Sequence, residues 1–248
     1  MDLKMEGSLS MDLECKCTTP AKVLGVLGGL GPAASAEFMR LLAEFAPAER
    51  DQDHPRVILF SDPWIPDRSE AILGKGETPG PALESGLKTL LKWGADLLAV
   101  PCNSAHYFID RFDRDHHLPL VHIVTATIEE ARDASPEGAW LLSTMGTLQC
   151  GIYQDYASKY GYTLFLPGEE MPGRIQQVIH LVKANRMDEA GEKIASVAGE
   201  LGKKRDLPVI AACTEIPLAY ERSRLPSEMM ISSLEALARA CISAIYEG

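Results

Sequence analysis

The chain has 248 residues and a formal net charge of -11, with 24 lysine and arginine residues against 35 aspartate and glutamate residues. This acidic balance argues against a nucleic-acid-binding groove, so no nucleic-acid partner is expected. The sequence has no run of 18 apolar residues, so neither a membrane span nor a membrane partner is expected. With 46% hydrophobic residues, the chain can bury the core of one large domain or of two small ones.

Residues 1–20 are predicted to form a poorly ordered leader. This segment is charged and lacks the apolar stretch of a signal peptide. Cys15 and Cys17 suggest half of a metal site, but no second close pair of Cys or His residues completes it, so no metal is expected. The six cysteines are too sparse and irregular for a disulfide scaffold, which predicts free thiols and a cytoplasmic location.

The first predicted strand, residues 23–27, leads into a glycine-rich turn and a helix over residues 32–45. Gly29, Gly31 and Ala34 match the G-x-G-x-x-A form of the dinucleotide-binding fingerprint, which is a weak signal by itself. In the other interpretation, the amides of this turn bind a carboxylate at the helix N-terminus.

A second strand, residues 56–60, leads into a proline-rich loop that ends at Arg68. The planar fork of an arginine suits a carboxylate, although the sequence equally allows a solvent-exposed arginine here. The following loop, residues 74–81, could form a lid, and residues 82–93 are predicted to be helical.

The most informative stretch surrounds Cys102. Four apolar residues and a proline precede it, which predicts a buried strand that ends just before the cysteine. A helix is predicted over residues 104–114, with Asn103 or Ser104 as its N-cap. A helix N-terminus would stabilise a thiolate at Cys102, whereas a buried and inert cysteine is the commoner outcome.

The second half opens with a predicted strand over residues 139–143. Its turn offers the hydroxyls of Thr144 and Thr147 and the amide of Gly146 to an anion, or serves ordinary turn chemistry. Lys183 lies beside the apolar face of a predicted helix and, on periodicity alone, is a solvated lysine. The other predicted elements are a strand over residues 118–124 and helices over residues 125–134, 153–160, 173–203 (interrupted near Asn185) and 227–246.

Cys213 repeats the context of Cys102. A short apolar run leads to it, a hydroxyl residue follows, and Pro217 suits the first turn of the next helix. The separation in sequence between strands 23–27 and 139–143 is nearly the same as the separation between Cys102 and Cys213. The repeat predicts two pseudo-symmetric α/β domains whose cleft faces two thiols toward one ligand. The expected domain ranges are residues 21–124 with 225–248 for the first domain, and residues 125–224 for the second.

Two thiols on opposite faces of a small ligand suit proton transfer at carbon with two bases. One thiolate removes a proton and the opposite thiol returns one, which inverts the stereocentre. Donors aimed at a neighbouring carboxylate would stabilise the carbanion. Asn103, Ser104 and Thr214 lie next to the cysteines and could supply these donors.

Four motifs together resemble the aspartate/glutamate racemase family, and within it the aspartate racemase branch. They cover most of the chain from about residue 21, in the order of the family. The motifs are Gly28-Gly29-Leu30-Gly31-Pro32, Ile65-Pro66-Asp67-Arg68, Pro101-Cys102-Asn103-Ser104-Ala105-His106 and Cys213-Thr214-Glu215.

This resemblance implies two flavodoxin-like domains, each a mainly parallel sheet flanked by helices, with the active site in the cleft between them. It implies racemisation of an acidic amino acid without pyridoxal phosphate, metal or other cofactor, in a homodimer. Cys102 and Cys213 would be the acid/base thiols, Arg68 would bind the side-chain carboxylate, and Lys183 would be a basic substrate-binding residue. The other implied substrate-binding residues are Gly29, Leu30, Asn103, Ser104, Thr144, Gly146, Thr147, Thr214 and Glu215.

Two positions depart from the pattern of the family. Leu30 stands where methionine is frequent and Ser104 where threonine is frequent, so the pocket wall could differ while the hydroxyl is kept. His106 follows Cys102 by one helical turn. It could polarise the thiol, or it could be held by structural hydrogen bonds.

Three functions are compatible with these features. The first is a racemase for aspartate or glutamate, which the pairing of Arg68 with Lys183 favours. The second is a related enzyme on the same fold, such as a maleate isomerase or a hydantoin racemase. The third is a nucleotide- or metabolite-binding module built on the glycine-rich turn, which leaves the two matched thiols unexplained.

Overall fold

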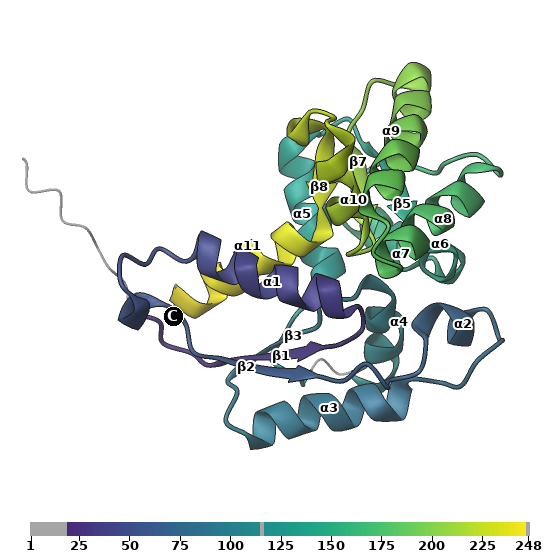
Figure 1. Ribbon diagram of the computed structural model, residues 1–248. Coiled ribbons are helices and arrows are strands. Elements are labelled where there is room, and N and C mark those ends of the chain that lie inside the picture. Colours follow the sequence, from purple (N-terminus) through teal and green to yellow (C-terminus); the bar gives the residue numbers. More distant parts are fainter. Residues whose placement is uncertain (1–18, 115–116, 247–248) are drawn as a thin grey trace, which may run out of the picture.

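The computed structural model describes residues 19–114 and 117–246, and within this part of the chain eight strands form two four-stranded parallel sheets (Figure 1). Apart from its last two residues, the expected leader 1–20, with Cys15 and Cys17, lies outside the described residues.

The first sheet has the strand order β2-β1-β3-β4. β1 lies in the middle because its five residues are all buried, and it pairs with β2 on one side and β3 on the other. Helices α1 and α11 cover one face of this sheet and α3 covers the other (Figure 1). The elements of this half are β1 (Leu24–Gly28), α1 (Pro32–Phe45), β2 (Val57–Ser61), α2 (Arg68–Ile72), α3 (Gly80–Lys92), β3 (Leu97–Ala99), α4 (Asn103–Phe112), β4 (Leu120–Val121) and, from the C-terminus, α11 (Ser233–Tyr246), with a 3-10 turn at Asp51–Asp53.

The second sheet repeats the same plan, with the order β6-β5-β7-β8. In each sheet the first strand of the half lies between the second and the third, which is the order of flavodoxin-like folds. Two pseudo-symmetric α/β halves are therefore confirmed. The elements of this half are α5 (Ile123–Ala134), β5 (Ala139–Ser143), α6 (Met145–Cys150), α7 (Ile152–Lys159), β6 (Leu164–Phe165), α8 (Met171–Lys183), α9 (Met187–Lys204), β7 (Val209–Ala212), α10 (Ile216–Ser223) and β8 (Met230–Ser232), with a 3-10 turn at Ser227–Met229.

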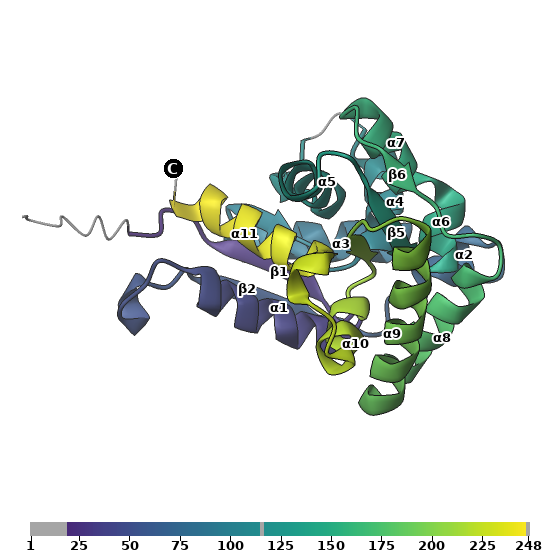
Figure 2. The same cartoon turned by 90° about the horizontal axis from the view of Figure 1, so that it is seen from above.

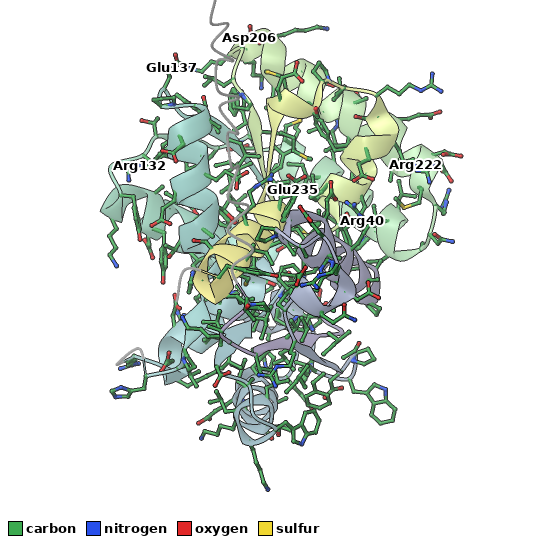
Figure 3. All side chains as sticks on the ribbon, turned by 90° about the vertical axis from the view of Figure 1, so that its left-hand side faces the viewer. Arg40, Arg132, Glu137, Asp206, Arg222 and Glu235 are labelled. Atoms are coloured by element: carbon green, nitrogen blue, oxygen red, sulfur yellow. The ribbon has the colours of Figure 1, made fainter. Side chains whose placement is uncertain are left out.

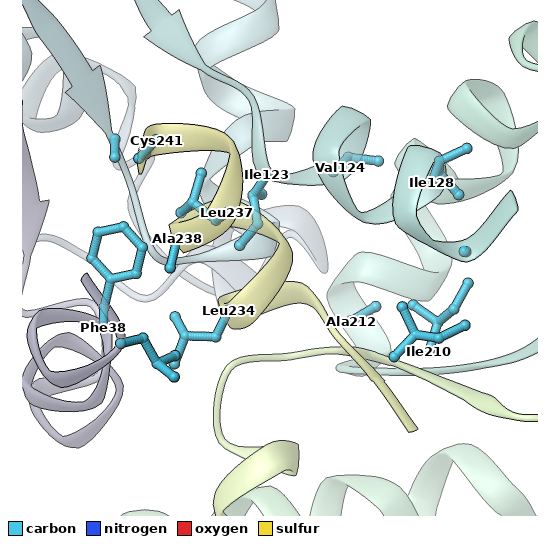
Figure 4. Close-up of a cluster of buried hydrophobic side chains, with 14 of the residues drawn as sticks. Phe38, Ile123, Val124, Ile128, Ile210, Ala212, Leu234, Leu237, Ala238 and Cys241 are labelled. Carbon is cyan, nitrogen blue, oxygen red and sulfur yellow. The ribbon is translucent and has the colours of Figure 1, made fainter. Parts of the chain in front are cut away.

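Helix α11 joins the two halves. It packs against α1 of the first half and against α5 (Figure 2). Figure 4 shows how Leu234 and Leu237 of this helix lie in one buried cluster with Phe38 of α1 and Ile123 of α5. The same cluster includes Ile210 of β7, so the two sheets share a continuous apolar core.

The C-terminal region differs from the expectation of one helix over residues 227–246. A 3-10 turn and β8 precede α11, and β8 pairs in parallel with β7 of the second sheet. Local periodicity could not reveal this strand because its pairing partner lies elsewhere in the chain. The strand also falls in the segment 225–248 that was expected to join the first domain; the domain ranges themselves stay a prediction. The expected interruption near Asn185 is present, since Asn185 adopts a positive φ of 57° between α8 and α9.

Many charged side chains lie on the outside of the molecule. Figure 3 shows Arg132, Glu137, Asp206 and Arg222 projecting from its periphery, and all four are exposed. In the described part of the chain, no helix combines the length and apolar character needed to cross a membrane.

Candidate active site

Both repeated cysteines lie at the carboxyl ends of the equivalent strands β3 and β7, and they line the same cavity. In parallel α/β sheets, ligands bind at this edge, where the strand order reverses. The cavity encloses about 30 Å³, which is room for a water molecule. Its lining residues are Leu30, Asp67, Arg68, Ser69, Cys102, Asn103, Ser104, Thr144, Thr147, Lys183, Ala212, Cys213, Thr214 and Glu215.

Cys102 itself is the N-cap residue of α4, with an extended backbone (φ -155°). The expectation that Asn103 or Ser104 caps this helix is wrong, because α4 already begins at Asn103 and its cap has no side-chain hydrogen bond. The Cys102 thiol lies 3.7 Å from the Ser104 hydroxyl, Sγ to Oγ. Cys102 is 6% exposed and stands at the N-terminus of α4.

His106 contacts the backbone of Cys102 rather than its thiol. Its Nδ1 lies 3.0 Å from the Cys102 carbonyl oxygen, while its Nε2 accepts a hydrogen bond from the Ile123 amide at 3.5 Å. Together these contacts define a neutral ring with the proton on Nδ1. Burial and the neighbouring His122 lower the pKa of His106 to about 3. A structural role for His106 therefore fits better than polarisation of the thiol.

Cys213 has an acidic neighbour. Its thiol donates a hydrogen bond to Glu215, with 3.0 Å between Sγ and Oε2, and the Thr214 hydroxyl lies 3.4 Å from the same oxygen. Burial and the Glu215 carboxylate raise the pKa of Cys213 well above its ordinary value. Lys183 acts in the opposite direction, because its positive charge favours the thiolate. The two thiols thus have different electrostatic surroundings.

Arg68 is buried and opens helix α2. Its guanidinium donates to the backbone carbonyls of Ile65 and Pro66 through Nη1, at 3.0 and 2.9 Å, and to that of Leu30 through Nη2, at 2.9 Å. Its buried Nε has no hydrogen-bond partner among the described residues. The interpretation of Arg68 as a solvent-exposed residue is therefore wrong. The side chain is anchored by the backbone and keeps a free donor beside the cavity.

Lys183 ends helix α8 and reaches the cavity from the second half. Although the residue is exposed, it lines both the small cavity and a larger neighbouring one of about 600 Å³. Arg68, Leu30 and Glu215 also line both cavities, so these residues form the wall between them. Two cationic side chains, one from each half, therefore flank the cavity that contains the thiols.

The turn after β5 brings Thr144 and Thr147 to the cavity, but Gly146 contacts the other half instead. The Thr144 hydroxyl caps α6 by accepting from the Thr147 amide at 3.0 Å, and it accepts from Ser69 of α2 at 3.1 Å. A Cβ atom on Gly146 would lie 2.7 Å from the Cα of Ser69. Gly146 thus permits the close approach of α2 and α6 across the cleft.

The glycine-rich turn is shaped by packing. Gly29 has a φ of +85°, and a Cβ atom there would lie 2.5 Å from the Asp62 backbone. Its amide donates to the Ser35 hydroxyl at 2.9 Å, so this amide is not available for a phosphate. Gly29 lines only the larger cavity. Leu30 is 4% exposed and forms part of the wall between the two cavities.

Sequence reasoning missed Asp67 and Ser69 as cavity residues. Asp67 caps α2 by accepting from the Glu70 amide at 2.9 Å. The Asp-x-x-Glu spacing before a short helix is a capping signal that could have revealed α2 and, with it, Ser69. Within residues 19–114 and 117–246, no group of three or more His, Cys, Asp or Glu side chains is arranged to hold a metal.

Comparison with known proteins points to one family. A model of the Asp/Glu/hydantoin racemase family matches residues 27–241. The aspartate racemase of Picrophilus torridus is 32% identical, with a TM-score of 0.80 over 91% of this chain and 94% of that chain. The glutamate racemase isoform RacE1 of Bacillus anthracis shares the fold at 17% identity, with a TM-score of 0.64 over 92% of this chain and 83% of that chain.

A curated relative agrees with these matches. The broad specificity amino-acid racemase RacX of Bacillus subtilis (strain 168) is 26% identical over 228 residues, covering 89% of this chain and 97% of the relative. The family resemblance and the two-domain α/β fold expected from the sequence are thus confirmed. The chain belongs to the Asp/Glu/hydantoin racemase family and is an isomerase of the amino-acid racemase type.

Proposed function

We propose that the protein interconverts the L and D forms of an acidic amino acid, aspartate or glutamate, by proton transfer between Cys102 and Cys213. The observation that carries this proposal is the convergence of both thiols on one cavity flanked by Arg68 and Lys183. The similarity to the aspartate racemase of Picrophilus torridus supports an acidic substrate.

In the proposed reaction, one cysteine acts as a thiolate and the other as a thiol. The thiolate takes the proton from Cα, and the electron pair of the broken C–H bond delocalises into the α-carboxylate. The opposite thiol then donates its proton to the other face of Cα and becomes a thiolate. Charge and protons balance, and the reverse reaction uses the same groups in exchanged roles.

The carbanion requires donors at the α-carboxylate. Ser104 and Thr214 carry hydroxyls beside the two thiols, and both residues line the cavity with Asn103. Thr144 and Thr147, in the turn and helix that follow β5, also line the cavity and carry hydroxyls. We assign these residues to the α-carboxylate, and we assign Arg68 and Lys183 to the side-chain carboxylate. We assign Glu215 to the ammonium group of the substrate, because the buried Oε1 of Glu215 has no hydrogen-bond partner among the described residues.

Substrate entry requires the cleft to widen, because the cavity of about 30 Å³ is smaller than an amino acid. The larger cavity shares lining residues with it, and we assign substrate entry to this side. Gly29 and Leu30 line the larger cavity, and Leu30 lines both.

The test is an exchange experiment in deuterated water without added cofactor. The reduced protein is incubated with L- and D-aspartate and with L- and D-glutamate, and inversion and α-deuterium incorporation are followed separately. Racemisation of one acid that is abolished by both Cys102→Ala and Cys213→Ala supports the proposal. Cys241→Ala is the matched control, since Cys241 is a buried thiol in α11 that does not line the cavity.

If no amino acid exchanges its α-proton, the proposed substrate class is wrong. Maleate isomerase or hydantoin racemase activity, also considered from the sequence, would then be assayed with the same variants. A homodimer, a cytoplasmic location and independence of cofactors remain predictions.

A further inference from the structure

A buried chain of hydrogen bonds links the segments that carry the two cysteines. The Asn103 amide is its centre: the Tyr153 hydroxyl donates to Oδ1 at 2.6 Å, and Nδ2 donates to the Ser233 hydroxyl at 2.9 Å. Ser233 in turn donates to the carbonyl oxygen of Ala211 at 2.7 Å. Tyr153 and Ser233 are fully buried and Asn103 is 3% exposed.

Two members of this hydrogen-bond chain, Asn103 and Ala211, lie close to the thiols in sequence. Asn103 follows Cys102 and is the first residue of α4. Ala211 belongs to β7, which ends immediately before Cys213. Ser233 stands where β8 gives way to α11, and α11 packs on both halves of the molecule. The hydrogen bonds therefore connect the first thiol-bearing segment to the second through the element that joins the two sheets.

The donors and acceptors of this chain permit one orientation of the Asn103 amide. Ser233 gives its only proton to Ala211, so its oxygen must accept from Asn103 Nδ2. Burial raises the pKa of Tyr153, which keeps its hydroxyl protonated and able to donate to Oδ1. In a flipped amide Oδ1 would face the Ser233 oxygen, whose proton is given to Ala211, and this buried acceptor would lose its donor, which is costly. Asn103, whose amide is held in this way, lines the cavity.

We propose that Tyr153 and Ser233 are positioning residues of the racemase. Through their hydrogen bonds to Asn103 they fix the position of the Cys102 segment relative to the strand that precedes Cys213. They thereby set the distance between the two thiols on either side of the substrate. This inference rests on the proposed two-thiol function. Neither residue lines the cavity, so Tyr153 acts through Asn103, and Ser233 acts through Asn103 and the Ala211 carbonyl.

Inversion and exchange depend differently on this spacing. Inversion needs both thiols within reach of opposite faces of one Cα. Exchange with retention needs one thiol, which removes the proton and returns a solvent-derived one. A displacement of about 1 Å in one group can cost about a hundredfold in rate. Loosening the chain of hydrogen bonds should therefore suppress inversion more than exchange.

The experiment compares Ser233→Ala and Tyr153→Phe with the wild type in deuterated water. For each protein, the formation of the opposite enantiomer and the deuterium content of the recovered starting enantiomer are measured from the same samples. The control is Ser232→Ala, because this neighbour is also buried but accepts from the Glu235 amide instead of bonding to Asn103. Thermal unfolding of every variant verifies that the fold is kept.

In both variants we expect the ratio of inversion to retained exchange to fall about tenfold or more, with the control at the wild-type ratio. Equal losses of inversion and exchange, or an unchanged ratio in folded variants, would overturn the positioning role while leaving the two-thiol function intact. If one variant fails to fold, the ratio in the other decides. If the wild type exchanges no amino acid, the proposed function fails and this inference fails with it.

Discussion

The thiol of Cys213 and the carboxylate of Glu215 form a direct hydrogen bond of 3.0 Å inside the cavity, whereas the Cys102 thiol has a hydroxyl neighbour at 3.7 Å. The pseudo-symmetric halves therefore present two chemically different thiols to one ligand. Glu215 keeps its second oxygen without a partner among the described residues, so its carboxylate is incompletely satisfied until a ligand binds.

The first prediction concerns this pair. Burial, the negative charge of Glu215 and the hydrogen bond to it all raise the pKa of Cys213. Replacing Glu215 by Gln removes the charge, so the pKa of Cys213 should fall and the thiolate should form at lower pH. The measurement is the pH dependence of Cys213 alkylation by iodoacetamide in a Cys102→Ala background, followed by peptide mass spectrometry.

Glu221→Gln is the matched control for this prediction, because Glu221 is an exposed acid on the following helix, α10, and does not line the cavity. Its alkylation profile should overlay that of the parent. A midpoint for Glu215→Gln at or above the parent value would show that the carboxylate does not hold the thiol in its protonated form.

The second prediction concerns Gly31, which allows Glu215 its position. Gly31 has a φ of +147°, and a Cβ atom there would lie 2.6 Å from Glu215 Oε1. Gly31→Ala should therefore destabilise the protein by roughly 1–3 kcal/mol and lower racemisation. The control Gly199→Ala adds a Cβ in open space on α9 and should be neutral or stabilising. Urea denaturation measures the stability of both variants. A Gly31→Ala protein as stable as the wild type would contradict the prediction.

A third prediction concerns the pH dependence of stability. The pKa of His106 is about 3 in the folded protein, against 6.5 for an unperturbed histidine. Between these values the unfolded chain binds a proton that the folded chain does not. The free energy of unfolding should therefore fall as the pH falls from 6.5 toward 3, by at most about 1.4 kcal/mol per pH unit from this residue.

Replacing His106 by Gln removes the group that binds this proton in the unfolded chain. The variant should be less stable than the wild type at pH 7.5, because the contacts to Cys102 and Ile123 are altered, but its stability should decline less steeply toward pH 5. Urea denaturation at pH 7.5, 6 and 5 measures both slopes. Parallel declines would mean that His106 titrates in the folded protein as it does in the unfolded chain.

The fourth prediction distinguishes the role of Arg68 from that of Lys183. Arg68→Lys keeps the charge but cannot bridge the carbonyls of Leu30, Ile65 and Pro66. It should lose about 1–3 kcal/mol of stability as well as activity. Lys183→Met removes an exposed charge, so stability should change by about 0.5 kcal/mol or less, while kcat/KM for the acidic substrate falls. Equal stability of the two variants would refute the anchoring of Arg68.

The local sequence was sufficient for the fold class and for the pair of cysteines. Apolar runs of strand length, each followed by a cysteine and a hydroxyl residue, mark β3 and β7, because burial on both faces of a parallel sheet leaves a continuous apolar signal. The helix of residues 32–45 was predicted with its observed bounds, since a proline fixes its start. The family motifs, being contiguous, were equally visible.

The contacts that shape the cavity could not be predicted in this way. Gly146 was expected to offer its amide to an anion, yet it packs on Ser69, and Arg68 was known only as a cation, not as a residue anchored by three carbonyls. Strand β8 was taken for helix because three residues of an edge strand carry little periodic signal.

The sequence by itself determined two α/β halves, each ending a central strand at a cysteine, because strand and helix patterns depend on neighbours along the chain. Only the tertiary structure decided that the Asn103 amide, which lies beside Cys102, joins Ser233 and through it the strand of Cys213. Asn103 and Ser233 are 130 positions apart in the sequence. A hydrogen bond over that separation leaves no local pattern, since it forms only when the two halves pack their apolar faces around α11.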